Sequence, residues 1–188
     1  MTTPFDVVAV IGSLRRESLT RRLVGALTAM APASLRIEVA EIAQLTLYNQ
    51  DLEDMPPIAW RSFRERIRRA DAVLFATPEY NRSIPGVLKN AIDVASRPYG
   101  ANAWAGKPAA IVSMSPGAMG AFGANHHLRQ ALVFLDMPTL QQPELYIGGA
   151  EKLLDGSDNV TNPSTRQFFT QFLQAFEAWI GRLRHSAH

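Results

Sequence analysis

The sequence predicts a doubly wound α/β protein, in which helices cover both faces of one parallel β-sheet. Two observations support this fold class. Five short apolar segments alternate along the chain with five segments of helical periodicity. Neither a repeat nor an internal linker interrupts the 188 residues, of which 47% are hydrophobic, enough for a single core. We therefore expect one domain, residues 1–188, with three layers in the order α/β/α.

The first half of the chain is expected to supply three strands and two helices. Each apolar segment is of the kind that fills a strand buried on both faces. The strands are expected at Phe5–Ile11, Leu35–Ile42 and Asp71–Ala76. The first helix has its apolar stripe at Leu19, Leu23, Leu27 and Met30. The second helix is expected from about Ile58 to Arg69.

The second half continues the alternation. A helix that lies on the sheet is indicated by the spacing of Val87, Leu88, Ala91 and Ile92. Strands are expected at Pro108–Ser113 and Thr139–Ile147, with a helix at about Phe122–Leu135 between them. The last helix carries an aromatic stripe from Phe168 to Leu183, which indicates core packing rather than a cofactor site.

The turn after the third expected strand is rich in polar side chains. Pro78 and Pro85 stand at its two ends and stiffen its backbone. The side chains that project between them are Glu79, Tyr80, Asn81 and Ser83. An ordinary strand-to-helix loop would explain the prolines but not this group of side chains. The turn is suited to a flat polar ligand.

The turn after the first expected strand is suited to an anion. Residues 12–18 lead directly into a helix, whose first turn presents unpaired N–H groups and the positive end of the helix dipole. Ser13 and Ser18 can donate through their hydroxyls, and Arg15 can bind a phosphate through two N–H groups. The segment matches neither GxGxxG nor the Walker pattern, so a phosphomonoester fits better than a dinucleotide or a nucleoside triphosphate. From these residues alone, a capped helix beside an unrelated arginine fits equally well.

A third turn, from Met114 to Gly120, follows the fourth expected strand. Its small residues allow the backbone to approach a ligand closely, although an ordinary glycine turn is the alternative. Ligands of doubly wound sheets bind beyond the carboxyl ends of the strands. The turns after strands one, three and four are therefore expected to form one site.

Residues 77–93 resemble the signature of the NAD(P)H-dependent FMN reductase family, which reads Pro-Glu-Tyr-Asn, then Ser, Pro-Gly, Leu-Lys-Asn-Ala and Asp. The resemblance extends along most of the chain and looks closest to the bacterial quinone and chromate reductases. It implies a flavodoxin-like fold with strand order 2-1-3-4-5, bound FMN, and NADPH or NADH as co-substrate. No catalytic residue is implied, because FMN carries the chemistry. The implied acceptors are quinones, azo compounds, chromate and free flavin.

The resemblance also implies which residues bind FMN. The FMN phosphate is assigned to Ser13, Arg15 and Ser18. The flavin ring is assigned to Pro78, Glu79, Tyr80, Asn81 and Ser83, together with Ser113 and Gly117. Ala121 stands where glycine is common in the family.

The relatives form dimers and tetramers, so the resemblance implies a homo-oligomer. It places Arg129 and Glu144 at an interface, where an arginine and a glutamate at matching positions bond across the tetramer. Arg129 follows Leu128 on a helix, and Glu144 lies in the fifth expected strand, at the edge of the sheet. Two solvated surface charges are the alternative.

Composition restricts the other partners. Lys plus Arg number 19 and Asp plus Glu 17, a net charge of +2, which is too balanced to indicate nucleic acid or a membrane surface. The chain has no cysteine, and His126 and His127 have no carboxylate pattern nearby, so no metal site is expected. Without a leader pattern or an apolar run approaching about 18 residues, we expect a cytoplasmic protein with no membrane insertion.

Two other classes share this topology. A flavodoxin-type electron carrier would bind FMN without substrate turnover of its own, but such carriers resemble acidic proteins, and this chain is near neutral. A receiver domain needs carboxylates after the first strand and an aspartate at the end of the third, and both are missing. The arginines of the second helix are interpreted as a solvated face, with a site for the phosphates of a nicotinamide cofactor as the alternative.

Overall fold

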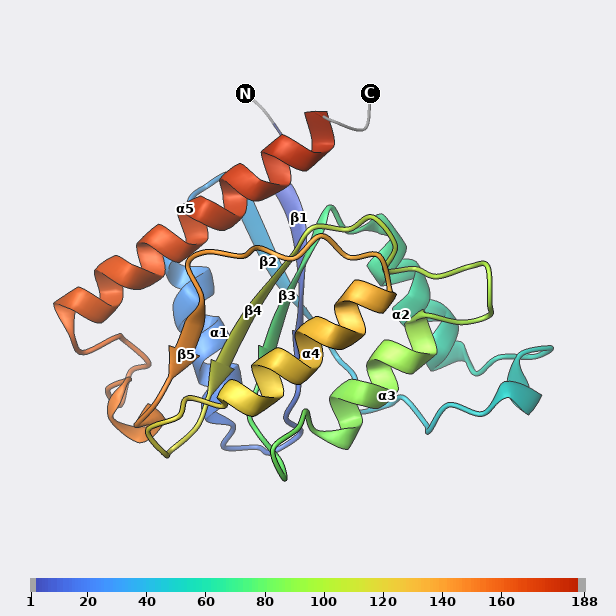
Figure 1. Cartoon of the computed structure of the whole chain (residues 1–188), viewed down its shortest axis with the longest axis horizontal. Helices are drawn as coiled ribbons and strands as arrows, with labels where there is room; N and C mark the ends of the chain where they lie inside the picture. Colours follow the sequence, from blue (N-terminus) through green and yellow to red (C-terminus); the bar gives the residue numbers. More distant parts are fainter. Residues whose placement is uncertain (1–2, 186–188) are drawn as a thin grey trace.

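In the computed structural model, which describes residues 3–185, five parallel strands form one sheet in the order β2-β1-β3-β4-β5 (Figure 1). This is the strand order expected from the sequence. The strands are β1 (Phe5–Ile11), β2 (Leu35–Ala40), β3 (Ala72–Thr77), β4 (Ala109–Met114) and β5 (Leu145–Ile147). Every residue of β3 and β4 is buried, which is why these two segments are continuous apolar runs.

Helices cover both faces of the sheet, so the three expected layers are present (Figure 1). One face is covered by α1 (Leu19–Met30) and α5 (Pro163–His185). The other is covered by α2 (Ile58–Arg69), α3 (Gly86–Ala95) and α4 (Phe122–Phe134). Short 3₁₀ turns occur at η1 (Gln50–Leu52) and η2 (Ala150–Lys152). No helix within residues 3–185 is long and apolar enough to cross a membrane.

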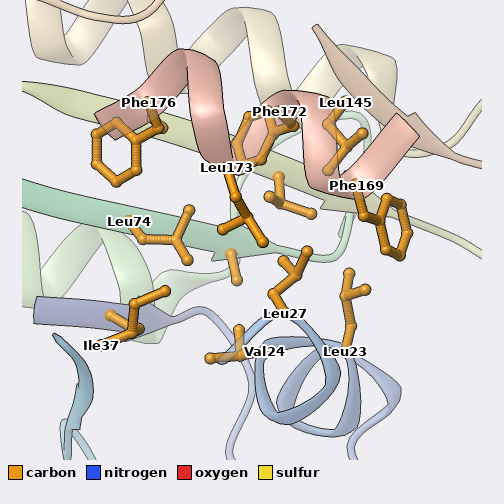
Figure 2. Packing of buried hydrophobic residues seen from close by; sticks show 14 of the residues in the cluster. Leu23, Val24, Leu27, Ile37, Leu74, Leu145, Phe169, Phe172, Leu173 and Phe176 are labelled. Atoms are coloured by element: carbon orange, nitrogen blue, oxygen red, sulfur yellow. The ribbon is translucent and has the colours of Figure 1, made fainter. Parts of the chain in front are cut away.

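The aromatic stripe of α5 packs into the core, as its spacing predicts. Phe169, Phe172 and Phe176 are each almost fully buried, and Figure 2 shows them above the leucines of α1 and the strand residues Ile37 and Leu74. The stripe is less regular at its start, where Phe168 is half exposed. The long final helix therefore closes one face of the sheet rather than a cofactor site.

The fifth strand is much shorter than the expected Thr139–Ile147. Only Leu145–Ile147 forms a ladder with β4, and Thr139 makes a single bridge to Ala109. Between them lies Pro143, which has no N–H to donate to a ladder. The polar residues Gln141, Gln142 and Glu144 also lie in this unpaired segment, so the expected strand was drawn across a stretch that does not belong to the sheet.

The arginine-rich helix α2 is not a uniformly solvated face. Arg64 is 3% exposed, donates two hydrogen bonds to Glu53 at 2.6 and 3.1 Å, and donates another to the Val94 carbonyl. Arg66 pairs with Asp6 at 2.9 and 3.0 Å, near the beginning of β1. These two arginines hold neighbouring elements together. The Arg66 contact lies at the amino-terminal end of β1, whereas the expected site lies at the carboxyl ends of the strands.

Candidate functional site

The turn after β1 holds donors that have no partner of their own. Ser18 caps α1 by accepting a hydrogen bond from the Arg21 N–H at 3.2 Å, which leaves its hydroxyl hydrogen free to donate. Ser13 is 6% exposed and Arg15 is exposed, and neither side chain makes a hydrogen bond or ion pair with any residue between 3 and 185. This set of donors, at the positive end of α1, is chemically suited to a phosphate.

The turn after β3 is a tight reverse turn. Tyr80 and Ser83 exchange two backbone hydrogen bonds of 2.9 Å, and Asn81 and Arg82 have φ values of 52° and 64°. Two central residues with positive φ are the mark of a type I′ turn, which asparagine tolerates well and arginine adopts only with strain. The result is a rigid projection that leaves half of Tyr80 exposed at its tip.

Besides an ion pair of 3.4 Å with Arg82 at the tip of the turn, the Glu79 side chain makes a contact that holds the turn to α4. Its Oε2 accepts a hydrogen bond of 3.0 Å from the N–H of Ala124, in the first turn of α4. The residue before α4, Ala121, offers no side-chain cap, so the Glu79 carboxylate fills that role. The close approach depends on Gly123, where a Cβ would lie 2.9 Å from the same oxygen.

The turn after β4 is held in place by hydrogen bonds of Ser113, a residue of β4. This side chain is fully buried, and its Oγ donates to the Gly120 carbonyl at 2.9 Å and accepts from the Asn125 side chain at 3.1 Å. Gly120 has a φ of +57°, and a Cβ there would lie 2.7 Å from the β5 backbone. Gly117, in contrast, is exposed. Ser113 therefore supports the turn, and Gly117 lies on its accessible surface.

Ala121, which stands just before α4, has a left-handed backbone. Its φ is 60° and its ψ 39°, which an alanine adopts only at a cost of about 1–2 kcal/mol. The methyl group is buried. The backbone at Ala121 therefore has a conformation that glycine adopts more easily, and the alanine side chain adds strain.

Two histidines on α4, considered in the sequence as possible metal ligands, contact side chains of other segments, and His127 contacts the predicted site residue Ser83. The Nδ1 of His127 lies 2.6 Å from the Ser83 Oγ, and the Nε2 of His126 lies 3.0 Å from the Tyr146 hydroxyl. Burial, followed by the hydrogen bond and charge of Glu144, raises the pKa of Tyr146 to about 12. No periodicity links residues 44 and 20 positions apart, so the sequence carries no signal for these contacts.

The largest cavity near these turns has a volume of about 660 Å³. The donors Ser13 and Arg15 stand on its wall, and so does Tyr80. The rest of the wall is mainly apolar and includes Ile42, Leu45, Leu47 and Val87. The structure thus joins the first two turns around one cavity. The remaining sequence-predicted residues are not part of its lining: Ser18, Pro78, Glu79, Asn81, Ser83, Ser113 and Gly117.

Arg129 and Glu144 face each other within one chain. Their nitrogen and oxygen atoms are 3.7 Å apart, and the two side chains are 19% and 32% exposed. Arg129 also donates to the Asn125 side chain at 3.0 Å and to the Leu140 carbonyl at 3.2 Å. In the single chain this arginine therefore joins α4 to the segment before β5. Contacts of this pair with another subunit stay a prediction.

A parallel sheet in the order 2-1-3-4-5, with unpaired donors in the turn after β1 and polar turns after β3 and β4, is the architecture of a flavodoxin-like mononucleotide-binding protein. The model of the NADPH-dependent FMN reductase family matches residues 5–152. The chain belongs to this family.

Individual relatives align with nearly the whole chain. A quinone reductase of Pseudomonas putida is 58% identical over 96% of this chain and 97% of its own length. A 2-hydroxy-1,4-benzoquinone reductase of a Burkholderia species is 43% identical over 93% and 95%. Among solved structures, the flavoenzyme NAD(P)H:(acceptor) oxidoreductase FerB of Paracoccus denitrificans is 41% identical, with a TM-score of 0.90, over 94% of this chain and 98% of FerB.

Proposed function

We propose that this protein binds FMN and uses NADPH or NADH to reduce quinones. The observation that carries the proposal is the position of Ser13 and Arg15. Both are donors without a partner among residues 3–185, and both line the same cavity as the exposed Tyr80 at the edge where this fold binds mononucleotides. The names of the relatives, a quinone reductase and a benzoquinone reductase, support the acceptor class.

The proposed cofactor fits the residues present. Arg15 would hold the FMN phosphate through two N–H groups, with the hydroxyls of Ser13 and Ser18 and the N-terminus of α1 as further donors. FMN, when bound, supplies acceptance and delivery of hydride. The protein's task is to hold the ring and a second molecule against each other.

We assign the ring to the two rigid turns. Pro78, Tyr80, Asn81 and Ser83 belong to the first of them, which its type I′ geometry and the Glu79 contact to α4 hold in place. Gly117 belongs to the second, which Ser113 supports through the Gly120 carbonyl. Pre-ordered turns lower the entropy cost of binding, because the chain does not have to be ordered by the ligand. No acid or base of the protein is assigned to the reaction.

The proposal includes a wider acceptor range, a location and an assembly. Azo compounds, chromate and free flavin are candidate acceptors besides quinones, since the flavin rather than a residue of the protein delivers the electrons. A cytoplasmic location is consistent with consumption of NADPH or NADH. A homodimer or homotetramer is proposed, with Arg129 and Glu144 near an interface.

The test is reconstitution with FMN followed by turnover. The purified protein should take up one FMN per chain and oxidise NADPH or NADH rapidly when a simple benzoquinone is added, without any partner protein. A flavodoxin-type carrier would bind FMN and show no such turnover. Protein that takes up no FMN and shows no FMN-dependent oxidation of either nicotinamide would overturn the proposal.

A further inference from the structure

Apart from Ser13 and Arg15, most of the cavity wall is apolar, and two of its leucines, Leu14 and Leu47, are exposed to solvent. We propose that this wall, formed by Leu14, Ile42, Leu45, Leu47 and Val87, binds an apolar substituent of the acceptor, so that alkyl-substituted quinones are the preferred substrates. The inference rests on the proposed function, because it names the substrate class of that site.

The first argument is that two large apolar side chains of this wall are exposed to solvent. Leu47 is 80% exposed and Leu14 is 49% exposed, although both face the cavity. Large apolar side chains gain free energy only when they are removed from water, and a group of them around a concave surface is a common feature of a ligand site. An alkyl chain that enters the cavity would cover both leucines at once.

The charge of the lining is the second argument. Apart from the phenol of Tyr80, Arg15 is the single ionisable residue on the described wall, and it is assigned to the FMN phosphate. No carboxylate contributes to the lining. The segment from Ile42 to Leu47 therefore offers nothing to a second charged group, and burial of a charge there would be unfavourable. An uncharged acceptor with a hydrocarbon chain fits this wall, whereas an inorganic dianion does not.

The wall is held in place, which is the third argument. Asn90 of α3 accepts a hydrogen bond from the Tyr48 N–H at 2.8 Å and donates to the carbonyls of Leu45 and Thr46 at 3.2 and 3.0 Å. One buried side chain thus fixes the backbone on both sides of Leu47. Leu47 is exposed without belonging to a free loop, as expected for a side chain that is positioned for a ligand.

The location of the wall connects it to the reaction. The cavity is continuous from Leu47 to Tyr80, whose turn is assigned to the flavin ring. A quinone ring held at Tyr80 would extend a substituent from its edge toward Leu47. Each CH₂ group that becomes fully buried raises affinity up to about fourfold.

The experiment compares 2-alkyl-1,4-benzoquinones that differ only in chain length: methyl, butyl and decyl. Their dissociation constants are measured calorimetrically on the oxidised FMN-loaded protein without NAD(P)H, below the concentrations at which the quinones aggregate. The kcat/KM for each quinone is measured separately. We expect decyl to bind at least about tenfold more tightly than methyl, and kcat/KM to follow the same order.

Leu47→Ser is the test variant, and Leu52→Ser is its control, because Leu52 lies in the same connection but outside the cavity. The ratio of the decyl to the methyl dissociation constant should move toward one in Leu47→Ser and stay at the wild-type value in Leu52→Ser. Equal affinity for all three quinones in the wild type, or an unchanged ratio in Leu47→Ser, overturns the inference.

Three further outcomes are informative. A Leu47→Ser variant that changes the KM for NADPH but not the chain-length ratio would assign the wall to the nicotinamide cofactor and would overturn the inference. If the wild-type enzyme reduces methyl-benzoquinone but gains nothing from longer chains, the inference fails and the proposed function stands. If no quinone is reduced at all, the proposed function itself fails.

Discussion

At the scale of single residues, Arg15 gives the most direct test of the proposed phosphate site. Arg15→Ala removes a charge-assisted contact of about 1.5–3 kcal/mol, so FMN affinity should fall between about tenfold and more than a hundredfold. Titration of apoprotein with FMN, followed by flavin fluorescence, measures the loss. Arg16→Ala is the matched control, because Arg16 is also exposed and lies next to Arg15 but not on the cavity wall. Unchanged affinity in Arg15→Ala would remove this residue from the phosphate site.

Tyr146 provides a prediction on pH. Its pKa of about 12 is higher than the ordinary tyrosine value, chiefly because of burial and then because of Glu144. The folded state therefore holds the phenol proton more tightly than the unfolded state, and this contribution to stability is complete below about pH 10 and disappears as the pH rises toward 12. Denaturant titrations across this range should show a shallower loss of stability in Tyr146→Phe than in the wild type.

The control for this prediction is Tyr99→Phe, since Tyr99 is 91% exposed. That variant should keep the pH dependence of the wild type. If Tyr146→Phe loses stability with pH as steeply as the wild type does, Tyr146 has no raised pKa in the folded protein.

At the scale of elements, the connection between β2 and α2 depends on Asn90. Asn90→Ala leaves the Tyr48 N–H and two carbonyls without their partner, which should destabilise the fold by about 1–3 kcal/mol. Hydrogen exchange should accelerate most at Tyr48, while the amides of β3 and β4 change only with global stability. Protection of Tyr48 equal to that of the wild type would show that Asn90 does not hold this connection.

The elements differ in how well their sequences predict them. β3 is a continuous apolar run because both of its faces are covered, and α2 begins and ends where its periodicity indicates. The expected fifth strand, Thr139–Ile147, was too long, because only the residues after Pro143 and Glu144 pair with β4 and Thr139 makes a single bridge. Arg64 was assigned to a solvated face, since nothing in the sequence marks Glu53, in an irregular segment, as its buried partner.

The site was predictable to a similar degree. The turn after β4 was expected at the same site as the turns after β1 and β3, but none of its residues lines the cavity. Parallel strands deliver their turns to one end of the sheet, so the meeting of the turns after β1 and β3 at one cavity follows from topology. The direction of the Glu79 side chain does not, because it depends on the close approach of Gly123. The contact of Ser83 with His127 and the role of Asn90 also arise only from packing between distant segments.

At the scale of the whole molecule, we predict a homo-oligomer larger than the 20.7 kDa chain. Val133 and Phe134, at the end of α4 beyond Arg129, are 77% and 80% exposed, as is typical of an apolar surface that a partner covers. Light scattering of the wild type, Arg129→Ala and Glu144→Ala at several salt concentrations measures the assembly. We expect both variants to dissociate more readily than the wild type.

Two results would contradict this prediction in different ways. A monomeric wild type ends the proposal of an assembly. Equal assembly of all three proteins confines Arg129 and Glu144 to the ion pair within one chain.

The central claim is that a single chain carries electrons from a nicotinamide to a quinone through bound FMN. Rapid mixing of the FMN-loaded protein with NADPH or NADH, without oxygen or acceptor, tests it most directly. We predict that the flavin absorbance is bleached within the turnover time and returns when a benzoquinone is added in a second mix. A flavin that stays oxidised with both nicotinamides, or that is bleached but not restored by quinone, would contradict the account.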